Sequence, residues 1–141
     1  MTLVLSRWLH LACALAAGTG LVYGWMLYLA EPADEFSLVN HPAQPSVQAA
    51  HILLSPLLLF LCGVIWRSHI WSKIRRRSKE RRITGWAMAL LLVPMVVSGY
   101  LIQVSDLQRE LWVWVHGVSS VTWVVAYLVH AATKPGTASA A

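Results

Sequence analysis

Two histidines lie in the last long apolar stretch of the chain, ELWVWVHGVSSVTWVVAYLVH, which runs from Glu110 to His130. His116 and His130 are 14 residues apart. On an α-helix their side chains therefore lie on nearly the same face, about 21 Å apart along the axis. Hydrocarbon offers an imidazole nitrogen no hydrogen-bond partner, so a histidine within a membrane span indicates a functional site. Two imidazoles on one face, at two depths, suggest two metal-containing cofactors stacked across a bilayer.

The composition places the elements that carry these histidines in a membrane. The chain of 141 residues is 57% hydrophobic and 12% charged, with a mean hydropathy of +0.58, whereas soluble domains carry roughly 25% charged residues. A chain of this length forms a single domain. Its two cysteines, Cys13 and Cys62, lie in apolar stretches and no CxxCH motif is present. Neither covalent haem attachment nor a structural disulfide is indicated.

Hydropathy predicts an all-α integral membrane protein, a four-helix bundle. The expected spans are residues 6–29, 47–66, 83–102 and 106–132, each close to or above the ~20 residues that cross a bilayer. The first is expected to be a retained helix and not a signal peptide. The transmembrane domain covers residues 1–133, and the polar tail 134–141 is expected to be disordered.

The charges of the loops predict the orientation. The connection RSHIWSKIRRRSKERR carries eight of the eleven Lys and Arg residues, whereas EPADEFSLVNHPAQPS carries three acids and no Lys or Arg. By the positive-inside rule, the basic loop and the N- and C-termini are cytoplasmic and the acidic loops lie outside. No aromatic-interleaved module accompanies the charge, so nucleic-acid binding is not expected. The eight basic residues are Arg67, Lys73, Arg75, Arg76, Arg77, Lys79, Arg81 and Arg82.

With this orientation, the histidines of the spans form two pairs of equal depth. His10 and His130 lie near the cytoplasmic face, and His51 and His116 lie near the outer face. Each pair can bind the iron of one non-covalent haem b, with one imidazole nitrogen from each side. We therefore expect His10 and His130 to ligate the inner haem iron and His51 and His116 the outer one. Bis-imidazole ligation favours electron transfer over oxygen binding.

Two histidines remain. His41 is expected to be an exposed loop residue. His69 lies 18 residues after His51, so it shares that face if the helix continues, about 27 Å deeper. We interpret His69 as an interfacial residue, and it is the alternative to His10 as inner ligand. A zinc or copper site is less favoured, because the histidines form distant pairs with no intramembrane carboxylate or CxxC motif.

A ligating imidazole usually donates its second ring N–H to an acceptor, which orients the ring. Hydroxyl groups in the spans are candidate partners, and tryptophans of the fourth span could flank a porphyrin. The hydroxyl candidates are Thr19, Ser55, Ser119, Ser120 and Thr122, and the tryptophans are Trp112, Trp114 and Trp123.

The pattern resembles the bacterial cytochrome b561 superfamily, which includes four-helix di-haem cytochromes and cytochrome b subunits of hydrogenases and dehydrogenases. The resemblance covers residues 6–132. It rests on a first-helix histidine in RWLHLA, one near the start of the second helix and two separated by 14 residues on the fourth. It implies that His10 and His130 share one haem and that His51 and His116 share the other. It further implies a bacterial inner-membrane location and electron exchange between quinone and a redox partner protein.

The sequence therefore predicts a transmembrane di-haem b-type cytochrome, a subunit of a respiratory electron-transfer complex in contact with membrane lipid. Two alternatives stay open. One is a stand-alone oxidoreductase that takes electrons from a small donor such as superoxide and passes them to quinone. The other is a haem-free structural or assembly protein whose histidines only pair helices.

Overall fold

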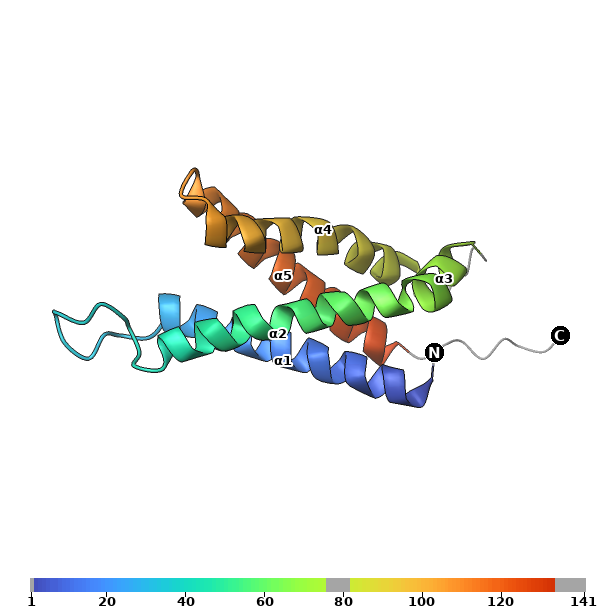
Figure 1. Ribbon diagram of the computed structural model, residues 1–141, viewed down its shortest axis with the longest axis horizontal. Helices are drawn as coiled ribbons and strands as arrows, with labels where there is room; N and C mark the ends of the chain where they lie inside the picture. Colours follow the sequence, from blue (N-terminus) through green and yellow to red (C-terminus); the bar gives the residue numbers. More distant parts are fainter. Residues whose placement is uncertain (1, 76–81, 134–141) are drawn as a thin grey trace. The chain divides into compact units, whose positions relative to one another are not determined.

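The computed structural model is helical throughout the part that it describes, residues 2–75 and 82–133 (Figure 1). Four helical stretches are long and apolar enough to cross a membrane, which confirms the predicted all-α class with four spans. The elements are α1 (Leu3–Tyr28), α2 (Gln44–Ile65), the π-helix η1 (Trp66–Trp71), α3 (Ser72–Arg75), α4 (Arg82–Val104) and α5 (Arg109–Ala132). The tail 134–141 and the basic residues Arg76, Arg77, Lys79 and Arg81 lie outside the described residues.

The helix boundaries fall within three residues of the expected spans. The fourth span was expected from residue 106, but α5 begins at Arg109. A turn occupies the intervening residues: the Leu107 N–H donates to the Ser105 hydroxyl oxygen at 3.2 Å, and Gln108 takes a left-handed conformation with φ 54°. Because left-handed backbone does not extend a right-handed helix, the helix starts after it.

The chain divides into two compact units, Met1–Ser72 and Lys73–Ala141. In the first unit α1 packs against α2, and in the second α4 packs against α5 (Figure 1). We refer to these pairs as the first hairpin and the second hairpin. The loop of the first hairpin is tied to α1 by Asn40, whose side-chain amide donates to the Leu27 carbonyl at 2.9 Å.

Apolar side chains cover the outside of both hairpins. Leu53 of α2 is 77% exposed and Leu90 of α4 is 65% exposed. In water such surfaces are unfavourable, whereas in a bilayer they contact acyl chains as apolar as themselves. The helices are therefore built for contact with membrane lipid.

The second span does not end at Ile65 but continues as η1, which contains His69. Each turn of a π-helix holds more residues than an α-helical turn. His69 is therefore rotated away from the face that an uninterrupted α-helix would share with His51. This corrects the expectation that the two residues lie on one face.

Candidate functional site

His51, the eighth residue of α2, packs its ring against Gly20 of α1. A Cβ atom at Gly20 would lie 2.9 Å from Cε1 of the ring, closer than real Cβ atoms approach. The Nδ1–H group donates to the Ala16 carbonyl oxygen at 3.1 Å, and Thr19 Oγ1 lies 3.1 Å from the same nitrogen. The Thr19 hydroxyl donates to the Leu15 carbonyl at 2.7 Å, so its oxygen is an acceptor toward His51.

His116, the eighth residue of α5, has the same surroundings on α4. A Cβ atom at Gly99 would lie 3.1 Å from Cε1 and 3.2 Å from Nδ1 of its ring. The Nδ1–H group donates to the Met95 carbonyl oxygen at 2.9 Å, with Ser98 Oγ at 3.5 Å. Ser98 is fully buried and donates its hydroxyl hydrogen to the Pro94 carbonyl at 2.5 Å.

We call this arrangement a histidine cradle. It consists of a glycine against the ring, a hydroxyl residue directly before the glycine, and a carbonyl four residues before it. A helical carbonyl has two lone pairs and uses one for the N–H group four residues later. When that later residue is glycine, no side chain shields the carbonyl, and a ring from the neighbouring helix reaches the second lone pair.

His130 contacts the same kind of dipeptide further down α4. Its Nδ1 lies 2.9 Å from Thr84 Oγ1, and a Cβ atom at Gly85 would lie 3.8 Å from its Cε1. Thr84–Gly85 precedes Ser98–Gly99 by 14 residues, and His130 follows His116 by 14. The antiparallel pairing of α4 and α5 therefore brings both histidines of α5 to a hydroxyl–glycine dipeptide of α4.

The cradle determines which ring nitrogen carries the proton. A carbonyl oxygen only accepts, so Nδ1 of His51 and Nδ1 of His116 are protonated. In the neutral imidazole the lone pair then lies on Nε2, the nitrogen that binds a metal. A metal-ligating histidine is typically oriented by such a bond to a backbone carbonyl. The two rings thus have the tautomer and the fixed orientation that an axial ligand requires.

The remaining histidines lie outside these cradles. His10 is the eighth residue of α1 and is exposed, and His69 is half-buried in η1. His41, expected to be exposed, is half-buried beside Trp25, with ring centroids 6.0 Å apart. His10, His51 and His69 belong to the first unit and His116 and His130 to the second. Each predicted ligand pair therefore takes one histidine from each hairpin.

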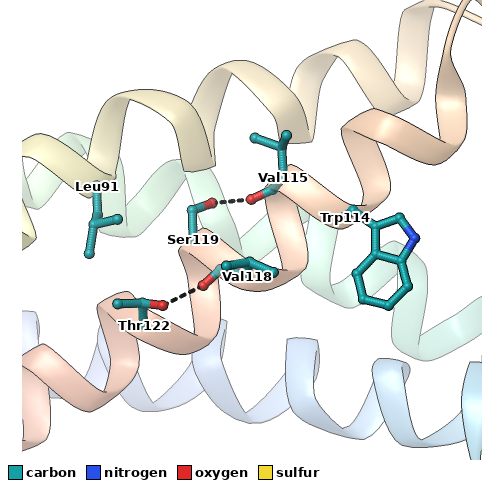
Figure 2. Close-up of a pocket in the computed structure, with 6 residues that line it drawn as sticks. All are labelled: Leu91, Trp114, Val115, Val118, Ser119 and Thr122. Atoms are coloured by element: carbon teal, nitrogen blue, oxygen red, sulfur yellow. Dashed lines mark hydrogen bonds between the residues drawn. The ribbon is translucent and has the colours of Figure 1, made fainter.

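Of the hydroxyl candidates, Thr19 contacts a histidine, whereas three others bond to their own helix. Ser55 donates to the His51 carbonyl at 2.7 Å. Ser119 donates to the Val115 carbonyl at 2.6 Å and Thr122 to the Val118 carbonyl at 2.7 Å (Figure 2).

The sequence analysis missed Ser98 and Thr84. Each directly precedes a glycine, and the two dipeptides repeat at the 14-residue interval of His116 and His130. This shared interval was the available signal.

A pocket of about 410 Å³ lies beside the His116 cradle on the second hairpin (Figure 2). Because the Ser119 and Thr122 hydroxyls donate to backbone carbonyls, the pocket offers few polar groups. An apolar molecule is suited to this surface. The lining residues are Leu91 of α4 and Trp114, Val115, Val118, Ser119 and Thr122 of α5.

Within residues 2–75 and 82–133, no three His, Cys, Asp or Glu side chains gather as a metal-ion site. A haem needs only an axial nitrogen from each side of its plane, so single oriented imidazoles are the relevant feature. No family model matches the chain, and comparisons with curated proteins and with solved structures found no match either.

Proposed function

We propose that this protein is a transmembrane b-type cytochrome that holds two haems b between its two hairpins and carries electrons across the membrane. The observation that supports this most directly is the pair of cradles around His51 and His116. Each fixes an imidazole with its lone pair on Nε2, as an axial ligand requires. With two imidazoles per iron, neither haem has an open position, and the cofactor supplies one-electron chemistry.

The positions of His51 and His116 support their assignment to one haem. Each is the eighth residue of the second helix of its hairpin. Seven residues of α-helix rise about 10 Å, so each lies about 10 Å from the start of its helix. If α2 and α5 both begin at the outer face, as the loop charges predict, the two imidazoles lie at the same depth.

The inner haem would take His130 from the second hairpin, about 21 Å below the level of His116. On the first hairpin, His10 lies ten residues below the Gly20 that touches His51, a rise of about 15 Å. Its Cα–Cβ bond tilts toward the helix N-terminus, which lowers the side chain further toward His130. His69 lies about 27 Å below His51 and off its face, so His10 is the better match.

The charges support an orientation with the α2–α4 connection in the cytoplasm. Arg67, Lys73, Arg75 and Arg82 are exposed at that end, as the positive-inside rule requires of a multi-pass bacterial inner-membrane protein. There they are also suited to bind anionic lipid headgroups or haem propionates.

Electrons would pass between quinone, within the membrane, and a redox partner protein. This makes the chain a subunit of a respiratory complex, in line with its resemblance to the cytochrome b561 superfamily. A quinone site needs a polar side chain at one membrane face. Tyr100, 56% exposed on α4, and His69 in η1 are the candidates.

The proposal is tested by a reduced-minus-oxidised absorption spectrum of the purified protein with a haem quantification. We expect a b-type α-band and two haems per chain. Absence of the band would leave the haem-free structural or assembly role, and one haem per chain would refute the two-pair assignment.

Single substitutions then test the pairing. His51→Ala and His116→Ala should remove the same haem and leave identical residual spectra, whereas His10→Ala and His130→Ala should remove the other. Retention of the inner haem by His10→Ala, together with its loss from His69→Ala, would assign the inner ligand to His69.

The electron donor is tested with the loaded protein in detergent. Reduction by quinol together with co-purification of a dehydrogenase or a soluble cytochrome supports the subunit role. Rapid reduction by superoxide without such a partner would instead indicate a stand-alone oxidoreductase. The acidic residues Glu31, Asp34 and Glu35 of the outer loop repel an anionic donor, so we expect the first result.

A further inference from the structure

Trp123 differs from the other tryptophans of the chain. It is 4% exposed and lies in the middle of α5, seven residues from His116 and seven from His130. Tryptophans of membrane proteins concentrate at the two interfaces, where their ring N–H group reaches water. Trp123 is therefore not part of such a belt. Six others are exposed, namely Trp8, Trp25, Trp66, Trp71, Trp86 and Trp114.

The indole N–H group of Trp123 donates to the Met88 carbonyl oxygen on α4 at 3.1 Å. Met88 lies seven residues before Met95, the acceptor of His116, and Trp123 lies seven residues after His116. Both bonds therefore follow one register, in which a ring N–H group of α5 reaches a backbone carbonyl of α4. Indole only donates, so this bond has one possible direction.

Tyr127 fixes the plane of the Trp123 ring. The two rings are nearly parallel, with an interplanar angle of 5° and centroids 5.7 Å apart. Tyr127 lies one helical turn from Trp123 toward His130. The aromatic pair thus occupies the stretch of α5 between the two histidines.

Apolar packing alone specifies the sliding position of two membrane helices weakly, because lipid competes for the same contacts. A slide by one residue shifts α5 by about 1.5 Å and rotates its contacts by about 100°. Such a slide would move His116 off Gly99 and His130 off Gly85 together.

We propose that Trp123 is a positioning residue whose bond to Met88 sets the register of α4 and α5, so that His116 and His130 reach their cradles simultaneously. The consequence for haem ligation rests on the proposed function, but the register itself does not. A space-filling role alone predicts a different outcome, because phenylalanine fills most of the indole volume and lacks the N–H group.

The test compares Trp123→Phe with Trp114→Phe in the full chain, without haem and with haem. Trp114 is 73% exposed on the same helix and provides the same chemical change away from the register. In the haem-free protein, ¹⁵N spectra of labelled histidine side chains report the tautomer of each ring. We expect Trp123→Phe to reduce the Nδ1-protonated signals of both His116 and His130, while the His51 signal and the Trp114→Phe spectrum match the unmodified protein.

In the loaded protein, Trp123→Phe should change the low-spin ferric EPR spectra of both haems, and Trp114→Phe should change neither. Unchanged His116 and His130 signals in Trp123→Phe, or a change at only one, would overturn the proposal. So would a simultaneous loss of the His51 signal, because Trp123 would then support the whole fold. If the unmodified protein binds no haem, the proposed function fails, and the haem-free spectra still decide the role of Trp123.

Discussion

In the first hairpin α2 places one histidine against α1, whereas in the second hairpin α5 places two against α4. The shared feature is the cradle of His51 and His116, with the same order of carbonyl, hydroxyl and glycine. The difference appears 21 residues into each second helix, where α5 has His130 and α2 has Ile65, which is 5% exposed. An aliphatic side chain cannot ligate iron, so the first hairpin has to supply an inner ligand from elsewhere.

This comparison separates two ways of presenting a histidine. A cradled imidazole is fixed by the neighbouring helix before any ligand arrives, so little rotamer entropy remains to be lost on binding. His10, exposed on α1, depends more on its partner for its final orientation. We therefore expect the proposed outer site, with two cradled ligands, to be the better preorganised of the two.

The largest effect is expected from Gly20→Ala in the first hairpin. The added Cβ atom would lie 2.9 Å from His51 Cε1, so the ring or the helix must move. Overpacking of this kind costs about 1–3 kcal/mol, against a gain of up to about 1 kcal/mol in helix propensity. Thermal unfolding in detergent should show a net loss of stability, and less outer haem should be retained. Gly24→Ala, with nothing within 4 Å of its Cβ position, is the control and should be neutral or stabilising.

The second hairpin contains its own matched pair on α4. In Gly99→Ala the Cβ atom would lie 3.1 Å from His116 Cε1, whereas in Gly85→Ala it would lie 3.8 Å from His130 Cε1, an ordinary contact. We expect Gly99→Ala to lower stability by about 1 kcal/mol and Gly85→Ala to leave it unchanged or raise it. Equal unfolding temperatures for the two variants would contradict the close packing of His116.

Smaller effects are expected from the hydroxyl groups. Thr19→Val keeps the branched shape but removes the oxygen 3.1 Å from His51 Nδ1, at a cost of about 1 kcal/mol. Ser98→Ala removes a longer contact of 3.5 Å to His116 Nδ1 and should cost about half as much. Denaturation in detergent ranks the two, with Ser55→Ala as control because its hydroxyl bonds only to its own helix. A larger effect of Ser98→Ala would reverse the assigned roles.

The smallest effect concerns the loop of the first hairpin. Asn40→Ala removes the 2.9 Å bond to the Leu27 carbonyl and leaves that oxygen accessible to water. We expect a loss of about 0.5 kcal/mol in unfolding free energy and faster backbone amide exchange near Asn40. The His51 side-chain signals should not change. A change in the His51 signals would mean that the loop helps to set the cradle.

The four helices could be predicted from the sequence because membrane spans are determined by long apolar stretches, which are local in the chain. The start of α5 was displaced to Arg109 because it depends on the left-handed conformation of Gln108, a non-glycine residue with no strong preference for it. The π-helix at Trp66–Trp71 has no proline or glycine that would mark it in advance.

The histidines themselves were identified from their residue type and spacing, but what holds them was not. The Ala16 and Met95 carbonyls are backbone groups, so no side chain at these positions signals their role. The glycines of the cradles were visible, yet glycine is common in membrane helices for packing alone. The pairing of His51 with His116 and of His10 with His130 stays a prediction, to be decided by haem counts of the single variants.

The burial of Trp123 gives the protein an internal optical reporter. Six of its tryptophans are exposed and Trp112 is half-buried, so a quencher dissolved in lipid or water suppresses most of the emission. The emission that persists then comes chiefly from the one indole that is enclosed between α4 and α5. That indole lies about 10 Å along the helix axis from each of the two α5 histidines. Its fluorescence follows events at the centre of the second hairpin without any introduced label.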